Sequence, residues 1–189
     1  MSLLDYAKLP FSFHEGWDEI RPLQLSVSKT FLLLVLPFSL LPPLMLLYAG
    51  SHHGSAYLID APFARWIGVA LAFLAAELLT VPLMGWAIRS IAQLQGIDAD
   101  YRDTFRLSAI TAIPMWLSST GLASADLGPM FAAVVLGLFL SAGVLYHGSY
   151  NFLQMRDPMQ AQALSCQAFA VGGMIWAFLC GLVILPLIH

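Results

Sequence analysis

The chain has 189 residues, of which 59% are hydrophobic and only 10% are charged, and its formal net charge is −3. Soluble domains contain about 45–50% apolar and about 25% charged residues, so this composition excludes an ordinary soluble domain and predicts an integral membrane protein. The two cysteines provide neither a disulfide framework nor the spacing of a metal site. The few basic residues form no cluster of the kind that binds nucleic acid, and we expect no nucleic-acid partner.

Residues 1–28 form an N-terminal segment that is polar enough to stay outside the hydrocarbon, and they lack the pattern of a cleavable signal peptide. Ser12 and Glu15 have the spacing of a capping box, in which each side chain bonds the backbone amide of the other. Apolar residues then recur at helical spacing, at Phe13, Trp17 and Ile20. We expect a short amphipathic helix that either lies in the membrane interface or folds back onto the rest of the chain.

Residues 29–189 contain five apolar stretches, and about 20 apolar residues in a helix cross the roughly 30 Å hydrocarbon layer. We expect transmembrane helices over residues 29–48, 63–88, 107–122, 130–152 and 163–187. Three prolines interrupt the first of them, which predicts a kinked or partly broken helix: Pro37, Pro42 and Pro43. The predicted fold class is therefore an all-α, polytopic membrane bundle with five transmembrane helices and a short N-terminal interfacial helix.

The basic residues predict how this bundle is oriented, because cytoplasmic loops of membrane proteins are enriched in Lys and Arg. Under the five-helix arrangement, only Arg65 falls on one side of the membrane. All the others fall on the opposite side: Lys8, Arg21, Lys29, Arg89, Arg102, Arg106 and Arg156. We therefore expect the N-terminus in the cytoplasm and the C-terminus outside.

Small residues recur at every fourth position in three of the expected helices. The sets are Gly68, Ala72, Ala76 and Thr80; Ala133, Gly137 and Ser141; and Gly173, Ala177 and Gly181. Such stripes let helix backbones approach closely in lipid. The favoured interpretation is packing within one bundle, and the second is a seam between two copies of the chain.

Three loose motifs and the five-helix layout allow a comparison with a known family. The motifs are a P-x6-W-x2-I pattern (Pro10, Trp17, Ile20), an A-x-P element (Ala112, Pro114) in the third helix, and the segment GVLYHGSYNFLQM at 143–155 with Tyr146, Gly148 and Tyr150. With them, nearly the whole chain resembles the bacterial branch of the Yip family, whose eukaryotic members are called Rab-interacting. The resemblance implies a five-span protein of the bacterial inner membrane. It transfers neither Rab binding nor any biochemical activity to particular residues.

Glu77 is the sharpest functional candidate, because it lies near the middle of the apolar residues 66–88. A carboxylate at that depth costs a few kcal/mol or more and normally faces protein or water. It either binds a proton or a cation in a transport path, or forms hydrogen bonds to neighbouring helices. His147, between Tyr146 and Tyr150, either contacts Glu77 or sits in the interfacial belt of aromatic residues.

Two groups of residues could hold a metal ion, but neither fits a known pattern. Asp98, Asp100 and Asp103 lack the calcium-loop spacing, and a solvated helix start, with Asp103 and Arg106 one turn apart, is the better interpretation. A set on the outer side is equally incomplete: His52, His53 and Asp60. No catalytic signature is present. We therefore expect no metal, no cofactor and no enzymatic activity.

The leading functional hypothesis is a non-enzymatic membrane protein that organises membrane or protein partners and forms a homo-oligomer. Its expected partners are the lipid bilayer and a second copy, and the sequence specifies no other protein partner. The alternative is a small transporter or channel for an ion, a proton or an amphiphile that uses Glu77. Further candidate residues for either role are His147, Tyr146, Tyr150 and Pro114.

Overall fold

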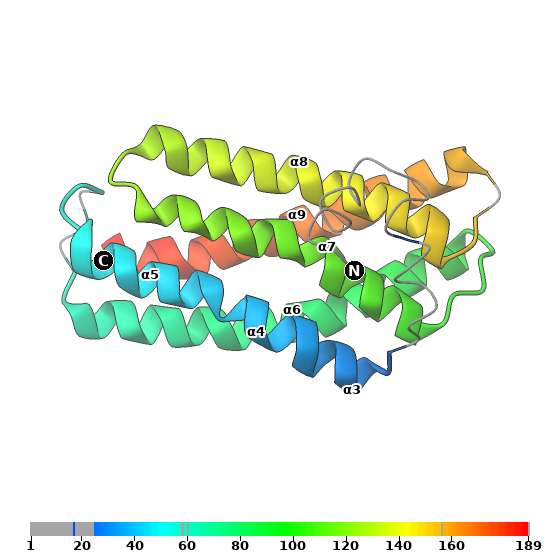
Figure 1. The fold of residues 1–189 in the computed structure, drawn as a ribbon, viewed down its shortest axis with the longest axis horizontal. Helices are drawn as coiled ribbons and strands as arrows, with labels where there is room; N and C mark the ends of the chain where they lie inside the picture. The colour runs from blue at the N-terminus through cyan, green and yellow to red at the C-terminus, as the bar shows by residue number, and fades with distance from the viewer. Residues whose placement is uncertain (1–16, 18–24, 58, 60, 156, 189) are drawn as a thin grey trace.

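The computed structural model describes residues 17, 25–57, 59, 61–155 and 157–188, and within these ranges every regular element is helical (Figure 1). The elements in order are α3 (Val27–Thr30), the π-helix η2 (Phe31–Val35), α4 (Leu36–Ser39), α5 (Leu41–His52), α6 (Phe63–Leu94), α7 (Tyr101–Ser118), the 3-10 helix η3 (Ser119–Ala123), α8 (Leu127–Phe152) and α9 (Pro158–Ile188). The all-α class predicted from the sequence is confirmed. The capping box at Ser12 and Glu15 lies outside the described residues.

Four helical segments are long and apolar enough to cross a membrane: Val27–His52, Phe63–Leu94, Leu127–Phe152 and Pro158–Ile188. The chain is thus a multi-pass membrane protein. Four of the five expected spans correspond to these segments. The helix expected at 107–122 is present as α7, but it begins six residues earlier, at Tyr101, and is not one of the four. Its first two turns contain Arg102, Asp103 and Arg106, which lower its hydropathy.

The first span is broken, as its prolines predicted. A π-helical turn at η2 is followed by α4, and the chain leaves the helical hydrogen-bond pattern at Leu40 before α5 begins. Proline has no N–H, so Pro42 and Pro43 cannot bond the carbonyls of Phe38 and Ser39 four residues earlier. The backbone N–H of Leu40 bonds the carbonyl of Phe38 instead, and the Ser39 hydroxyl donates to the carbonyl of Leu36 at 3.1 Å.

The helix α7 lies inside the bundle rather than at its edge. It packs against α6 on one side and α8 on the other, while α9 also contacts both α6 and α8 (Figure 1). The broken first span covers α6 and α7, through α4 and α5. In Figure 1 the long helices run side by side along the length of the molecule, with α7 parallel to them.

The contact between α6 and α7 is close at Gly85 and includes hydrogen bonds from two side chains of α7. A Cβ atom at Gly85 would come within 2.9 Å of the Phe105 Cα, so a side chain there is excluded. The Ser108 hydroxyl donates to the carbonyl of Val81 at 3.1 Å. The Tyr101 hydroxyl donates to the carbonyl of Pro82 at 3.2 Å. The proline in α6 is thus flanked by two hydrogen bonds from α7.

The small-residue stripes differ in whether another helix of the bundle packs against them. In α8, Gly137 packs against Pro114 and Ser118 of α7, and the Ser141 hydroxyl donates to the Thr111 carbonyl at 2.8 Å. That stripe therefore packs within the bundle. A Cβ atom at Gly173 or Gly181 of α9 would meet nothing within 4 Å. The same holds for the first glycine of the α6 stripe, Gly68.

One end of the bundle is built around two buried side chains, Trp17 and Arg106. Trp17 is 1% exposed and lies edge-on to Phe152, with ring centroids 5.6 Å apart, so this residue of the N-terminal segment is folded onto the bundle. The guanidinium of Arg106 lies 5.0 Å from the centroid of the Phe152 ring and 3.6 Å from an oxygen of Asp103. Asp103 and Arg106, which the sequence places one turn apart at a helix start, thus form an ion pair. The expected solvation is wrong for Arg106, which is 3% exposed, because the aromatic residues cover it.

The glycine contacts predict opposite effects for the same substitution at two positions. Gly85→Ala should destabilise the protein by about 1–3 kcal/mol, because α6 and α7 must separate to admit the methyl group. Gly173→Ala should leave stability unchanged or raise it by up to about 1 kcal/mol, because alanine is the better helix former and meets open space. Equilibrium unfolding of both variants in micelles measures this difference. Equal effects at the two positions would contradict the described α6–α7 contact.

Candidate functional site

Glu77 lies on the inward face of α6 and is 5% exposed. The indole N–H of Trp116, on α7, is the hydrogen-bond partner of its carboxyl group. Trp116 is itself buried, and its ring stacks on Phe38 of α4 with centroids 6.3 Å apart. The carboxyl group is therefore held where α4, α6 and α7 meet.

The register of the helices places Glu77 level with the break in the first span. The first span and α6 run antiparallel, with Gly50 against the ring of Trp66 and Val35 in the same buried cluster as Val81. Counting equal steps along both helices from either pair brings Ser39 opposite Glu77. Ser39 is fully buried. The buried carboxyl group is thus level with the turn where prolines leave backbone carbonyls without their helical partners.

One oxygen of this carboxyl group, Oε2, is buried and has no hydrogen-bond partner among the described atoms. An unpartnered buried acceptor costs about 1–3 kcal/mol, and more if the group is charged. A proton on the carboxyl group, or a cation shared with the nearby carbonyls, would remove that cost. The arrangement can therefore hold a proton or a small cation.

His147 lies on α8, away from Glu77. Its Nδ1 lies 2.8 Å from the carbonyl oxygen of Gly143, one turn earlier, and its ring lies edge-on to Tyr146. The next residue, Gly148, packs against Leu107, whereas Glu77 pairs with Trp116, nine residues further along α7. The offset is roughly 13 Å at 1.5 Å per residue. The structure therefore gives Glu77 and His147 separate surroundings on the two sides of α7.

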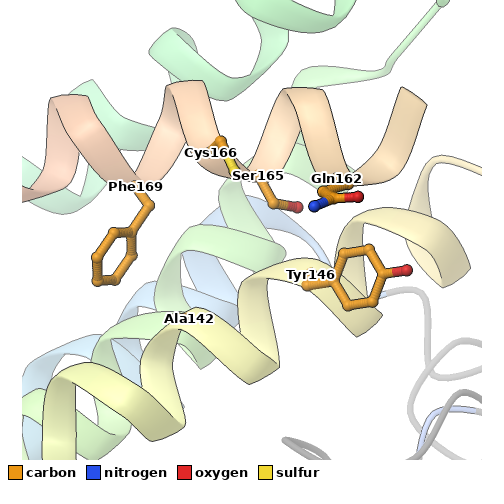
Figure 2. Close-up of a pocket in the computed structure, with 6 residues that line it drawn as sticks. All are labelled: Ala142, Tyr146, Gln162, Ser165, Cys166 and Phe169. Atoms are coloured by element: carbon orange, nitrogen blue, oxygen red, sulfur yellow. The ribbon is translucent and has the colours of Figure 1, made fainter. Parts of the chain in front are cut away.

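Tyr146 and Tyr150 both pack against the cluster of buried residues at the Trp17 end of the bundle. Tyr146 also lines a groove of about 400 Å³ between α8 and α9 (Figure 2). The other lining residues are Ala142 of α8 and Gln162, Ser165, Cys166 and Phe169 of α9. Pro114 lies neither at the Trp17 end of the bundle nor in the groove. Its carbonyl packs beside Gly137 at the α7–α8 crossing.

The outer histidines have protein partners. The Nε2 of His53 lies 3.0 Å from the Ala123 carbonyl oxygen, and His52 stacks on Tyr48 with ring centroids 4.3 Å apart. Asp100 caps the start of α7 by accepting from the backbone N–H of Arg102. Within the part of the chain that the structure describes, no group of three His, Cys, Asp or Glu side chains could hold a metal ion.

The sequence pointed to Glu77 but not to the residues that surround it. Trp116, Phe38 and Ser39 have ordinary helical neighbours, and nothing in their spacing indicates that they meet a carboxyl group. The α8–α9 groove was missed for the same reason, because Gln162 and Phe169 face residues from another helix. The local signals for this site were the acidic residue Glu77 within an apolar stretch and the prolines of the first span.

These observations define a polytopic helical membrane protein whose interior holds one buried carboxyl group beside a broken span. The Yip1 domain family matches residues 8–186, and the chain belongs to the Yip family. No curated protein and no solved structure matched this chain. The family membership expected from the sequence motifs is thus confirmed over nearly the whole chain.

The pairing of Glu77 with Trp116 can be tested with a double-mutant cycle. Trp116→Phe keeps the ring that stacks on Phe38 but removes the N–H, so it should destabilise the protein by about 1–3 kcal/mol. In a Glu77→Leu background the same change should cost far less, because the acceptor is gone. Equilibrium unfolding in micelles measures all four species. Additive effects would show that the two side chains do not interact.

Proposed function

We propose that this protein is a non-enzymatic organiser of membrane or protein partners that works as a homo-oligomer in the bacterial inner membrane. The observation that carries the proposal is the open stripe on the outer half of α9. Gly173 and Gly181 meet nothing within 4 Å, so the backbone there is accessible to another helix. Close backbone approach at such stripes is a main source of helix association in lipid.

The proposal includes five spans, with the N-terminus in the cytoplasm and the C-terminus outside. The placement of α7 between α6 and α8 supports the fifth span, because its Arg106 is buried against Asp103 and Phe152 rather than directed at lipid. The distribution of Lys and Arg supports the orientation. A helix of only moderate hydropathy can cross when protein covers its polar side chains.

Self-association is tested by closing the stripe with larger side chains. In the double variant Gly173→Leu and Gly181→Leu, the affinity of self-association should fall at least tenfold, which corresponds to about 1.4 kcal/mol. Light scattering in micelles over a range of protein concentrations measures the distribution. Ala132→Leu, on an exposed position of α8, is the matched control and should leave it unchanged.

A wild-type protein that stays monomeric at every concentration would overturn the homo-oligomer. A stripe variant that unfolds is recognised from its melting curve. In that case the milder Gly173→Ala and Gly181→Ala changes provide the comparison, since both meet open space.

A second candidate function is transport of a proton or a monovalent cation through Glu77. The unpartnered Oε2 of Glu77, opposite the turn at Ser39, supports it. Transporters commonly bind their coupling ions where a discontinuous helix frees backbone carbonyls. This candidate requires flux, whereas the organising function does not.

Flux in proteoliposomes separates the two candidates. If transport is the function, the wild-type protein should carry protons or monovalent cations and Glu77→Gln should abolish the flux, because the amide neither takes up a proton nor provides the negative charge that balances a cation. Glu77→Asp, which keeps the carboxyl group, should retain part of it. Absence of flux in a folded wild-type protein would exclude conduction of these ions and leave the organising function.

A further inference from the structure

The groove between α8 and α9 has a polar end and an apolar end. Tyr146 and Gln162 lie nearest the connection between the two helices, which joins Phe152 to Pro158. Ala142 lies one turn further along α8, and Phe169 lies about 10 Å further along α9 than Gln162. Figure 2 shows the Tyr146 ring and the Gln162 amide at one end and the Phe169 ring at the other. The lining of the groove thus becomes less polar with increasing distance from the connection between α8 and α9.

The floor of the groove has no unmet polar group. The Ser165 hydroxyl donates to the Ala161 carbonyl at 2.7 Å and lies 3.4 Å from the Ser149 hydroxyl. Ser165 is buried, whereas Gln162 and Cys166 are exposed at the opening. None of the hydrogen bonds among the described residues involves the Gln162 amide. The groove therefore presents Tyr146 and Gln162 at its mouth and an apolar wall below them.

This order matches the order of polarity in one leaflet of a bilayer. Both α8 and α9 are long and apolar enough to cross the membrane, so their shared end lies near the interface and Phe169 lies within the hydrocarbon. A phospholipid at this place would direct its ester and phosphate groups at the interface and its acyl chains inward. The volume of about 400 Å³ falls within the range of sites for small molecules.

We propose that the α8–α9 groove binds one phospholipid from the leaflet next to the α8–α9 connection. An acyl chain lies along Ala142 and Phe169, and the ester or phosphate oxygens accept a hydrogen bond from the Gln162 amide. The basic residues place this leaflet on the cytoplasmic side. None of the six lining residues is Lys or Arg, so zwitterionic phosphatidylethanolamine binds as well as anionic phosphatidylglycerol. The site contains neither Glu77 nor the glycines of the α9 stripe.

Photo-crosslinking with a phosphatidylethanolamine that carries a diazirine in the middle of its acyl chain tests the site. In the full-length protein in liposomes, adducts should concentrate on the α8 and α9 peptides around Ala142 and Phe169. Ala142→Trp fills the groove and should lower the adduct yield there at least fivefold. Ala142→Leu should lower it by a smaller factor and serves as the variant if the tryptophan prevents folding.

A second groove gives the matched control. It has a volume of about 330 Å³ and lies between the start of α6 and the end of α9. Its lining residues are Arg65, Gly68, Val69, Ala72, Leu182 and Pro186. Ala72→Trp fills this groove and should leave the adducts near Ala142 unchanged. Gln162→Ala should weaken retention of the lipid in native mass spectrometry without changing the melting temperature, because its amide bonds only the lipid.

Cys166 provides an independent measure, because it lines the groove. In a Cys180→Ser background, added phosphatidylethanolamine should slow alkylation of Cys166 in micelles, and Ala142→Trp should remove the effect of lipid. Adducts spread evenly over exposed positions such as Phe139 and Phe131 would show general bilayer contact only and overturn the site. Oxidative crosslinking of Cys166 between two copies, in place of lipid protection, would assign the groove to a second copy and also overturn it.

Discussion

Hydrocarbon offers no hydrogen bonds, so every break in a spanning helix of this protein must be compensated by other side chains. In the described part of the bundle, α7 donates side-chain hydrogen bonds to α6 at three places. Tyr101 and Ser108 donate to the carbonyls of Pro82 and Val81, and Trp116 bonds Glu77. The same property explains why α7 is less apolar than its neighbours. Its polar side chains are used inside the bundle, and α7 is not among the four helical segments apolar enough to cross a membrane.

The same contacts bring the acidic group and the broken span together. Phe38 of α4 stacks on Trp116, so the α4 segment, α7 and the carboxyl group of Glu77 form one connected arrangement. The α8–α9 groove is lined by residues of α8 and α9, and none of the residues around Glu77 lines it.

Membership in the Yip family is compatible with the arrangement around Glu77 and with the α8–α9 groove, since neither of these features requires a catalytic group. The described interior contains close helix crossings at Gly85 and Gly137, the buried acid Glu77, and the buried Arg106, which pairs with the half-buried Asp103. The outer surface carries the open part of the α9 stripe and the α8–α9 groove. Both proposed interactions, with a second copy and with a lipid, therefore involve the surface rather than the interior.

Composition and periodicity in the sequence determined the membrane class, the helical architecture and the position of the first-span break, because apolar length and proline chemistry act locally. They also determined that Glu77 is at membrane depth. Only the tertiary structure decided what that carboxyl group faces, because Trp116 and Ser39 come from helices distant in sequence. It likewise decided that Gly137 is packed while Gly173 is open, since identical small-residue spacing contains no information about which side of a helix has a neighbour. For Arg106, the charge pattern predicted solvation, and burial under Phe152 arose from packing between helices that no local rule describes.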